Sequence, residues 1–353
     1  MRRWFLLLIA LGLLAGCDGL LGEGEDTVLV VVATDGGRLI RLNASDEEAN
    51  QAWSAELPAS SAVRLLVSGA DVFAASGTQL AGFDLDSGAA LWTAPHDFGV
   101  TVVNVVGPID NLLFALTFDD LVAIDLANGD EVWRQDLNLT LTDAADEALV
   151  AAGGALILGG SPIRSIDPAT GDVLATFDTP DSDIRALAIE GGSVFAGLAD
   201  GLVALDAVSL SQEWRVDAAA QVDNLALGGG SVLYSVLGGG IAAVSTGGAD
   251  EGAAEDGEIF QQLAVDGERY LGVRADGLLA AWDRTAFASC TVAADCPVLW
   301  EVPGTSATVD ALAVGSNAIY YANGGILDAV IRGDGGSLWT YQTDGNVVAV
   351  VVP

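Results

Sequence analysis

The side chains that most often carry enzyme chemistry are scarce in this chain. It contains a single histidine, His96, and no lysine among its 353 residues. Histidine-based catalytic triads, histidine-ligated zinc sites and lysine Schiff bases are therefore disfavoured. His96 follows Pro95 shortly after Trp92, between two repeated units, and we expect it to be a solvated loop residue.

Carboxylates are the abundant ionisable groups. There are 49 acidic residues against 13 basic ones, which gives a formal net charge of −36. A pair of carboxylates can hydrolyse a glycosidic bond, but with so many acids a pair chosen from the sequence is uninformative. A strongly negative surface repels nucleic acid and anionic lipid headgroups. The sequence has no phosphate-binding P-loop or dinucleotide fingerprint, and we predict no catalytic residue, no metal site and no bound cofactor.

Two of the three cysteines, Cys290 and Cys296, lie six residues apart in a predicted loop. An exported protein reaches an oxidising compartment, so we expect a disulfide bond between them. A metal site is the alternative, and it would need a histidine or a third cysteine nearby, which the sequence lacks.

The beginning of the sequence is typical of such an exported protein. Two arginines precede the apolar run 4–14, which is long enough for a signal peptide but short for a membrane span. The tetrapeptide at 14–17 resembles a bacterial lipobox, with Cys17 as the lipidated residue. We expect a signal peptide at 1–16, a lipidated tether at 17–26 and a folded domain at 27–353. An ordinary signal peptide with an incidental cysteine is the alternative.

One sequence motif recurs along the predicted folded domain: an apolar residue, Asp, a short turn that often contains Gly, and then Trp. The clearest copies are 83–92 and 124–133, and in the third copy Ala175 stands at the Trp position. The repeated aspartates are Asp84, Asp125, Asp167, Asp206 and Asp283. The repeated tryptophans are Trp53, Trp92, Trp133, Trp214, Trp300 and Trp339. We expect the aspartates to cap turns and the tryptophans to pack in the core; calcium ligation and a sugar-binding platform are the alternatives.

Eight units of about forty residues predict an all-β, eight-bladed β-propeller. Their marker positions are 53, 92, 133, 175, 214, 260, 300 and 339. Each unit reads as four short antiparallel strands; in the unit 184–216 we expect strands at 184–189, 193–198, 202–206 and 212–216, with an Asp-Gly hairpin turn supplying a positive φ. The first unit lacks a first strand, and the run 345–352 reads as a first strand with no unit after it. We therefore expect the C-terminal strand to join the first blade and close the ring.

Two segments depart from the repeat. The acidic insert 247–258 lengthens one unit, and we expect a solvated loop, with a partner contact as the alternative. The tripeptide 332–334, Arg-Gly-Asp, matches an adhesion motif, but it lies where the last blade requires a turn, and we predict a turn.

The units resemble the PQQ-like, quinoprotein-type propeller repeat, most closely at 119–133 and 200–206, and the resemblance spans 27–353. It implies that each Trp packs between neighbouring blades and that each Asp caps a turn. The quinoprotein dehydrogenases of this family hold PQQ and calcium and have adjacent cysteines, whereas Cys290 and Cys296 are not adjacent. The signal, lipobox, length and blade number are similar to those of the BamB-type lipoproteins.

The resemblance implies a function as well as a fold. We expect a monomeric, non-catalytic envelope lipoprotein that faces the periplasm and binds protein partners, with BamA as the implied partner in outer-membrane β-barrel assembly. We expect attachment to the outer membrane; Asp18, directly after Cys17, resembles an inner-membrane retention signal, so the inner membrane is the alternative. The alternatives are a lipoprotein that binds another envelope protein or a polysaccharide, and a quinone-cofactor enzyme.

Overall fold

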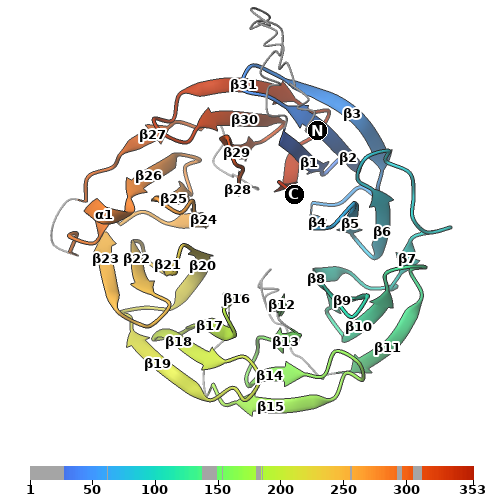
Figure 1. Cartoon of the computed structure of the whole chain (residues 1–353), viewed down its shortest axis with the longest axis horizontal. Coiled ribbons are helices and arrows are strands. Elements are labelled where there is room, and N and C mark those ends of the chain that lie inside the picture. The colour runs from blue at the N-terminus through green and yellow to red at the C-terminus, as the bar shows by residue number, and fades with distance from the viewer. Residues whose placement is uncertain are drawn as a thin grey trace, which may run out of the picture.

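The computed structural model describes residues 28–61, 63–136, 149–152, 154–179, 184, 186–254, 257–291, 296–304 and 312–353. Within them, eight four-stranded antiparallel sheets stand around a central axis as the blades of a propeller (Figure 1). The predicted fold class is confirmed. The predicted signal peptide, Cys17, Asp18 and the tether lie outside the described residues. No helix in the described ranges is long and apolar enough to cross a membrane.

In each of the first four blades the strands follow one another from the centre to the rim. They are β32 (Val347–Val351), β1 (Val28–Thr34), β2 (Arg38–Ala44) and β3 (Ala49–Glu56); β4 (Val63–Ser68), β5 (Asp71–Ser76), β6 (Gln79–Asp84) and β7 (His96–Asp97); β8 (Val102–Ile109), β9 (Leu112–Thr117), β10 (Asp120–Asp125) and β11 (Glu131–Asp136); and β12 (Leu149–Ala152), β13 (Ala155–Leu158), β14 (Ile163–Ile166) and β15 (Val173–Phe177).

The last four blades have the same order of strands, with one short helix, α1 (Arg284–Phe287), inserted in blade 7. They are β16 (Leu187–Glu190), β17 (Ser193–Leu198), β18 (Gly201–Asp206) and β19 (Gln212–Asp217); β20 (Val222–Gly228), β21 (Ser231–Val236), β22 (Ile241–Ser245) and β23 (Asp250–Ala254); β24 (Phe260–Val265), β25 (Arg269–Arg274), β26 (Leu279–Asp283) and β27 (Trp300–Val302); and β28 (Leu312–Val314), β29 (Ala318–Asn323), β30 (Ile326–Ile331) and β31 (Ser337–Gln342).

The C-terminal strand closes the ring, as the sequence predicts. β32 pairs antiparallel with β1 through Val31–Val351, Val32–Val350 and Ala33–Ala349, on the central side of blade 1 (Figure 1). The side-chain amide of Asn346 adds a hydrogen bond to the Asp35 carboxylate at 2.8 Å. This pairing hides the strand edges that β1 and β32 would otherwise expose.

The hydrophobic core is divided among the contacts between blades. Runs such as 30–33 in β1 are buried on every residue because the sheet is covered on both faces. One cluster of buried side chains lies between each pair of neighbouring blades; between blades 1 and 2 it includes Val31, Leu39 and Val72. Each blade therefore depends on both neighbours for the burial of its faces.

The unit 184–216 shows how far the strand predictions hold. β17 has the predicted bounds, whereas β16 begins at Leu187, three residues after the predicted start. Gly201 does not have the positive φ expected of the Asp-Gly turn. A Cβ at Gly201 would lie 2.2 Å from the carbonyl oxygen of Val216, so this glycine is required by the close approach of β19.

The acidic insert contains the outer strand of blade 6, and the predicted solvated loop at 247–258 is wrong for its central residues. Residues 250–254 form β23 and pair with β22. Glu251 is partly buried; its carboxylate accepts hydrogen bonds from the hydroxyls of Ser231 and Tyr270, the latter at 2.8 Å. Phe260, assigned as the marker of this unit, lies instead in β24, the inner strand of the next blade. The repeat pattern fails at this unit because blade 6 has no outer-strand tryptophan.

Candidate functional site

The repeated tryptophans join six of the eight blades to the blade that follows. The indole Nε1 of Trp53 donates a hydrogen bond of 2.9 Å to the carbonyl oxygen of Leu85, in the outer turn of the following blade. The other repeated tryptophans make the same bond to the next turn: Trp92 to Leu126, Trp133 to Pro168, Trp214 to Thr246, Trp300 to Arg332 and Trp339 to Ser45. These indoles are therefore engaged in joining blades.

Three of the turns that receive an indole, at 84–88, 125–129 and 167–171, are shaped by an aspartate and a glycine, whereas Asp206 and Asp283 lie in turns that receive none of these indoles. The Asp84 carboxylate accepts hydrogen bonds from the hydroxyl and the amide of Ser87, and these bonds lower the pKa of Asp84. Gly88 has a φ of 71°, and a Cβ there would lie 2.7 Å from the Trp53 ring. The other repeated aspartates also accept backbone amides: Asp125 from Ala127, Asp167 from Ala169, Asp206 from Ser209 and Asp283 from Ala286.

At two contacts between blades, the outer strand has no tryptophan. A large side chain in the turn of the following blade is found there instead. Blade 4 has Ala175 at the Trp position, and Leu210 occupies the glycine position in the turn of blade 5. Leu210 is buried and has a φ of 53°, which is unusual for leucine. Gly252 takes the Trp position in blade 6, and Phe287 of α1 takes the glycine position in blade 7 and is fully buried. A large side chain on one blade thus accompanies a small one on the other.

Two further segments singled out in the sequence have structural partners. Cys290 and Cys296 are joined by a disulfide bond directly after α1. Arg332 of the Arg-Gly-Asp tripeptide donates from Nε to the Asp266 carboxylate at 3.0 Å and from Nη1 to the carbonyl oxygen of Ser316 at 2.8 Å. The Asp266 side chain is fully buried, so Arg332 neutralises a buried charge and is held within the fold.

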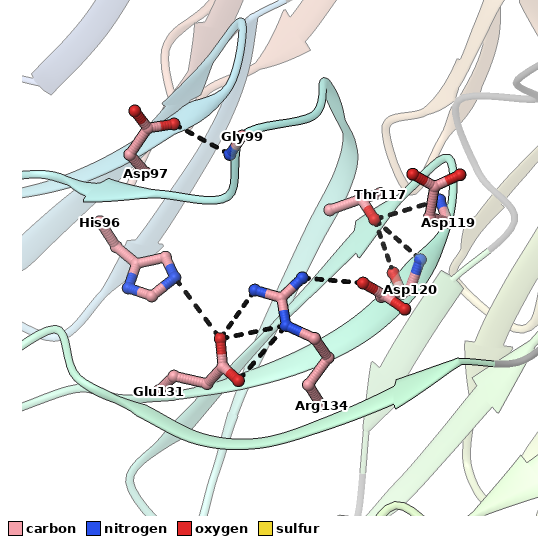
Figure 2. Close-up of polar contacts among 8 residues, drawn as sticks. All are labelled: His96, Asp97, Gly99, Thr117, Asp119, Asp120, Glu131 and Arg134. Atoms are coloured by element: carbon pink, nitrogen blue, oxygen red, sulfur yellow. Dashed lines mark hydrogen bonds and ion pairs between the residues drawn. The ribbon is translucent and has the colours of Figure 1, made fainter.

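His96 takes part in a polar network that joins blades 2 and 3, and the prediction of a solvated loop residue is wrong. It lies in β7, and its Nδ1 is 3.2 Å from the carbonyl oxygen of Gly129. Its Nε2 points towards Glu131 of β11, 4.0 Å away (Figure 2). Because a carbonyl oxygen only accepts, Nδ1 carries the proton in this contact. The side chain is partly buried, and its ring contacts that of Phe98 edge-on.

Glu131 links this histidine to a second ion pair. Arg134 donates to Glu131 at 2.7 Å and to Asp120 of β10 at 2.8 Å (Figure 2). The hydrogen bond from Arg134 lowers the pKa of Glu131, and that bond likewise raises the pKa of Arg134. Thr117 accepts the amide of Asp120 at 2.9 Å and so orders the hairpin turn beside the pair. We name His96, Glu131, Arg134 and Asp120 the rim network.

An apolar cavity of about 300 Å³ lies between the outer parts of blades 1 and 2. Leu57 and Pro58, which follow β3, line one side, and Phe83, Trp92 and Pro95 of blade 2 line the other. We name this space the rim cavity. Apolar walls with few polar groups are typical of ligand-binding pockets, and this volume is at the lower end of their range.

The rim cavity results from two extra residues in the outer strand of blade 2. In blade 5, Asp217 pairs with the first residue of β18 and lies 11 residues after the turn aspartate Asp206. In blade 2, Asp97 pairs with the first residue of β6 and lies 13 residues after Asp84. The extra length falls between Trp92 and His96, and β7 is reduced to two residues. This bulge could have been found from the spacing of 41 residues between Trp92 and Trp133, but its burial and its neighbours could not.

No group of three metal-ligating side chains occurs in the described part of the chain. The repeated tryptophans and aspartates, the disulfide and Arg332 all stabilise turns or blade contacts. The rim cavity and the adjacent rim network form the candidate functional site, because the repeat itself does not require them.

Comparisons with known proteins agree with the propeller repeat. Residues 15–161 match the family model described as outer membrane protein assembly factor BamB. BamB from Moraxella catarrhalis superposes with a TM-score of 0.67 at 15% identity, over 82% of this chain and 89% of that chain. Apo AztD from Citrobacter koseri superposes with a TM-score of 0.69 at 12% identity, over 93% of this chain and 98% of that one.

A quinohemoprotein is also similar in fold. The quinohemoprotein alcohol dehydrogenase from Comamonas testosteroni has a TM-score of 0.65 at 13% identity, over 82% of this chain and 68% of that one. No curated protein matches this chain in sequence. At these identities the solved structures establish a shared fold and leave the activity open. The predicted resemblance to the PQQ-like propeller repeat family is confirmed, by the BamB family model over residues 15–161 and by an eight-bladed ring similar in fold to BamB, AztD and a quinohemoprotein.

Proposed function

We propose that this chain is a non-catalytic envelope lipoprotein that acts as a scaffold for protein partners, in a role like that of BamB in outer-membrane β-barrel assembly. The observation that carries the proposal is the match of residues 15–161 to the BamB family model, together with the closed eight-bladed ring. BamA is the proposed partner. We also propose that acylated Cys17 attaches the chain to a membrane, and we favour the outer membrane over the inner membrane.

The roles of the repeated residues support a scaffold. The tryptophans and turn aspartates hold neighbouring blades and turns in place, and the single histidine bridges two blades. A rigid ring with many exposed turns offers a broad surface for other proteins, while its negative charge favours basic partner surfaces.

An in-cell crosslink tests this proposal. The lipidated full chain is crosslinked in its own organism, purified by affinity, and its partners are identified by mass spectrometry. We expect BamA in an amount comparable to the chain. Enrichment of a different envelope protein, with BamA at background, would overturn the BamB-like role.

The membrane anchor has its own test. We expect the substitution Cys17→Ser to abolish acylation and to move the chain from the membrane fraction to the soluble periplasmic fraction, because the attached acyl chains hold it at the bilayer. Intact-mass measurement of the wild-type chain should show the added acyl groups. A substituted chain that stays in the membrane fraction would contradict the anchor.

A further inference from the structure

We propose that the rim cavity binds an extended polypeptide segment of a partner protein, through one large apolar side chain flanked by arginine or lysine. The inference deepens the proposed scaffold function and rests on it. It assigns the contact to the outer rim between blades 1 and 2, and it is specific about the chemistry of the segment bound.

The walls of the cavity select an apolar anchor. Leu57, Phe83 and Trp92 are buried in the fold yet border the cavity, while Pro58 and Pro95 are exposed at its edges. A volume of about 300 Å³ is of the size of one or two large side chains rather than of a cofactor. Burial of a leucine or aromatic side chain in such a site contributes about 1.5–3 kcal/mol from its apolar surface.

The negative charge at the entrance of the cavity favours a basic residue beside the apolar anchor. Glu56, the last residue of β3, lines the cavity and is exposed. Its register partner Arg38 pairs with Asp344 at 2.7 Å and donates to the Ser54 hydroxyl at 2.8 Å. Among the described residues, the Glu56 carboxylate has no hydrogen-bond or ion-pair partner. A chain of net charge −36 adds a long-range attraction for cationic segments.

The cavity is held open by the fold. Its blade 2 wall is the bulge before β7, and β7 is held in place from the other side by His96, which contacts Gly129 and points towards Glu131 of blade 3 (Figure 2). The blade 1 wall is held by the bond from the Leu57 amide to the carbonyl oxygen of Gly37 at 2.7 Å. A preformed site loses little conformational freedom on binding.

Peptide binding to the purified folded domain, residues 27–353, tests the inference, once circular dichroism shows cooperative unfolding of that fragment. The probe is a fluorescein-labelled ten-residue peptide with a central tryptophan between two arginines, in glycine and serine. Fluorescence anisotropy is measured at about 150 mM salt, where long-range attraction is largely screened. We expect saturable binding, and at least tenfold weaker binding when serine replaces the tryptophan or glutamates replace the arginines.

Three variants localise the binding. Ala81→Leu fills the cavity from β6, and Glu56→Arg reverses the charge at its mouth; we expect each to weaken binding at least tenfold. Glu47→Arg makes the same charge change at an exposed position in the outer turn of blade 1 and should change binding less than twofold. Thermal unfolding of each variant separates loss of the site from loss of the fold.

Two outcomes would overturn the inference. Equal binding of the tryptophan and serine peptides, or unchanged binding by folded Ala81→Leu, would show attraction by net charge only. Self-association of the domain in sedimentation, abolished by Ala81→Leu, would show that a second copy occupies the cavity. Neither result bears on the in-cell crosslink, so a chain that captures BamA but not the peptide would retain the proposed function and lose this site.

Discussion

At the scale of single residues, the glycines of the outer turns have two separate reasons to be glycine. Gly129 has a φ of 78°, which favours glycine on any surface, and a Cβ there would lie 2.6 Å from the Trp92 ring. Gly191 has a φ of 61° with no atom within 4 Å of a Cβ. Substitution of Gly129 and of Gly191 therefore separates the energetic cost of the backbone conformation from the cost of packing against tryptophan.

We predict that Gly129→Ala destabilises the domain more than Gly191→Ala does. Both substitutions should cost about 1–2 kcal/mol for the left-handed backbone. Gly129→Ala should cost about 1–3 kcal/mol more, because the indole must move. Chemical denaturation of both variants measures the difference, and equal losses would contradict the packing role of the turn glycine.

Glu131 gives a pH-dependent contribution to stability. Its folded-state pKa is lowered, first by the hydrogen bond from Arg134, so the folded state favours the ionised form. The resulting stabilisation is present above the unfolded pKa of about 4.3 and is lost as pH falls through the lower folded value. His96 and Arg134 face this carboxylate, and Asp120 shares Arg134.

We predict that Glu131→Gln lowers the midpoint of thermal unfolding at pH 7 and that the difference from wild type shrinks as the pH falls below the unfolded pKa of about 4.3. Unfolding followed by circular dichroism across this range measures it. A difference that stays constant with pH would show that Glu131 acts through packing alone.

At the scale of elements, complementarity between outer strand and turn explains how blades of unequal sequence keep one geometry. Leu210 belongs to the cluster against which Ala175 packs, and the carbonyl oxygen of Phe287 would lie 2.0 Å from a Cβ at Gly252. Such pairs are expected to be energetically coupled, because each residue fits only the size of the other.

A double-mutant cycle tests this coupling. We predict that Leu210→Gly alone costs about 2–5 kcal/mol through the cavity it leaves, and that Ala175→Trp alone is destabilising through overpacking. The double variant recreates the Trp–Gly pair of the other blades and should be more stable than the sum of the single losses predicts. Additive losses would show that the two positions are independent.

At the scale of the whole molecule, the ring depends on the pairing of β32 with β1. Removal of residues 345–353 exposes the inner edge of β1 and takes Val347 and Val350 from the cluster between blades 8 and 1. We predict a large fall in the unfolding midpoint and rapid amide exchange in β1, measured by hydrogen exchange. Protection of β1 unchanged by the truncation would contradict closure of the ring by this strand.

Much of the ring could be predicted from the sequence because the repeat encodes one structural unit. Asp84 and Trp92 mark a turn and an outer strand by their spacing alone, and the apolar run at the C-terminus predicts the strand at 347–351. The assignment of blade 6 is wrong because Gly252 stands where the Trp marker would be. Its partner Phe287 lies in the next unit and shows its role only when the blades are in contact.

The candidate site was much less predictable. A two-residue insertion before β7 changes the unit spacing slightly, but only the packed blades show that it opens the rim cavity. The sequence gives no sign that His96 is partly buried, because its partners, Gly129 and Glu131, lie more than thirty residues away in another blade. The sequence of a single unit does not indicate which contacts that unit makes with another blade.

The most direct test of the central proposal is binding of the purified folded domain to the purified periplasmic part of BamA from the same organism, measured by isothermal titration calorimetry. A scaffold of this kind predicts saturable binding with one BamA per propeller. No heat of binding at concentrations of tens of micromolar, with both proteins folded, would contradict the BamB-like role and leave a propeller that serves a different partner.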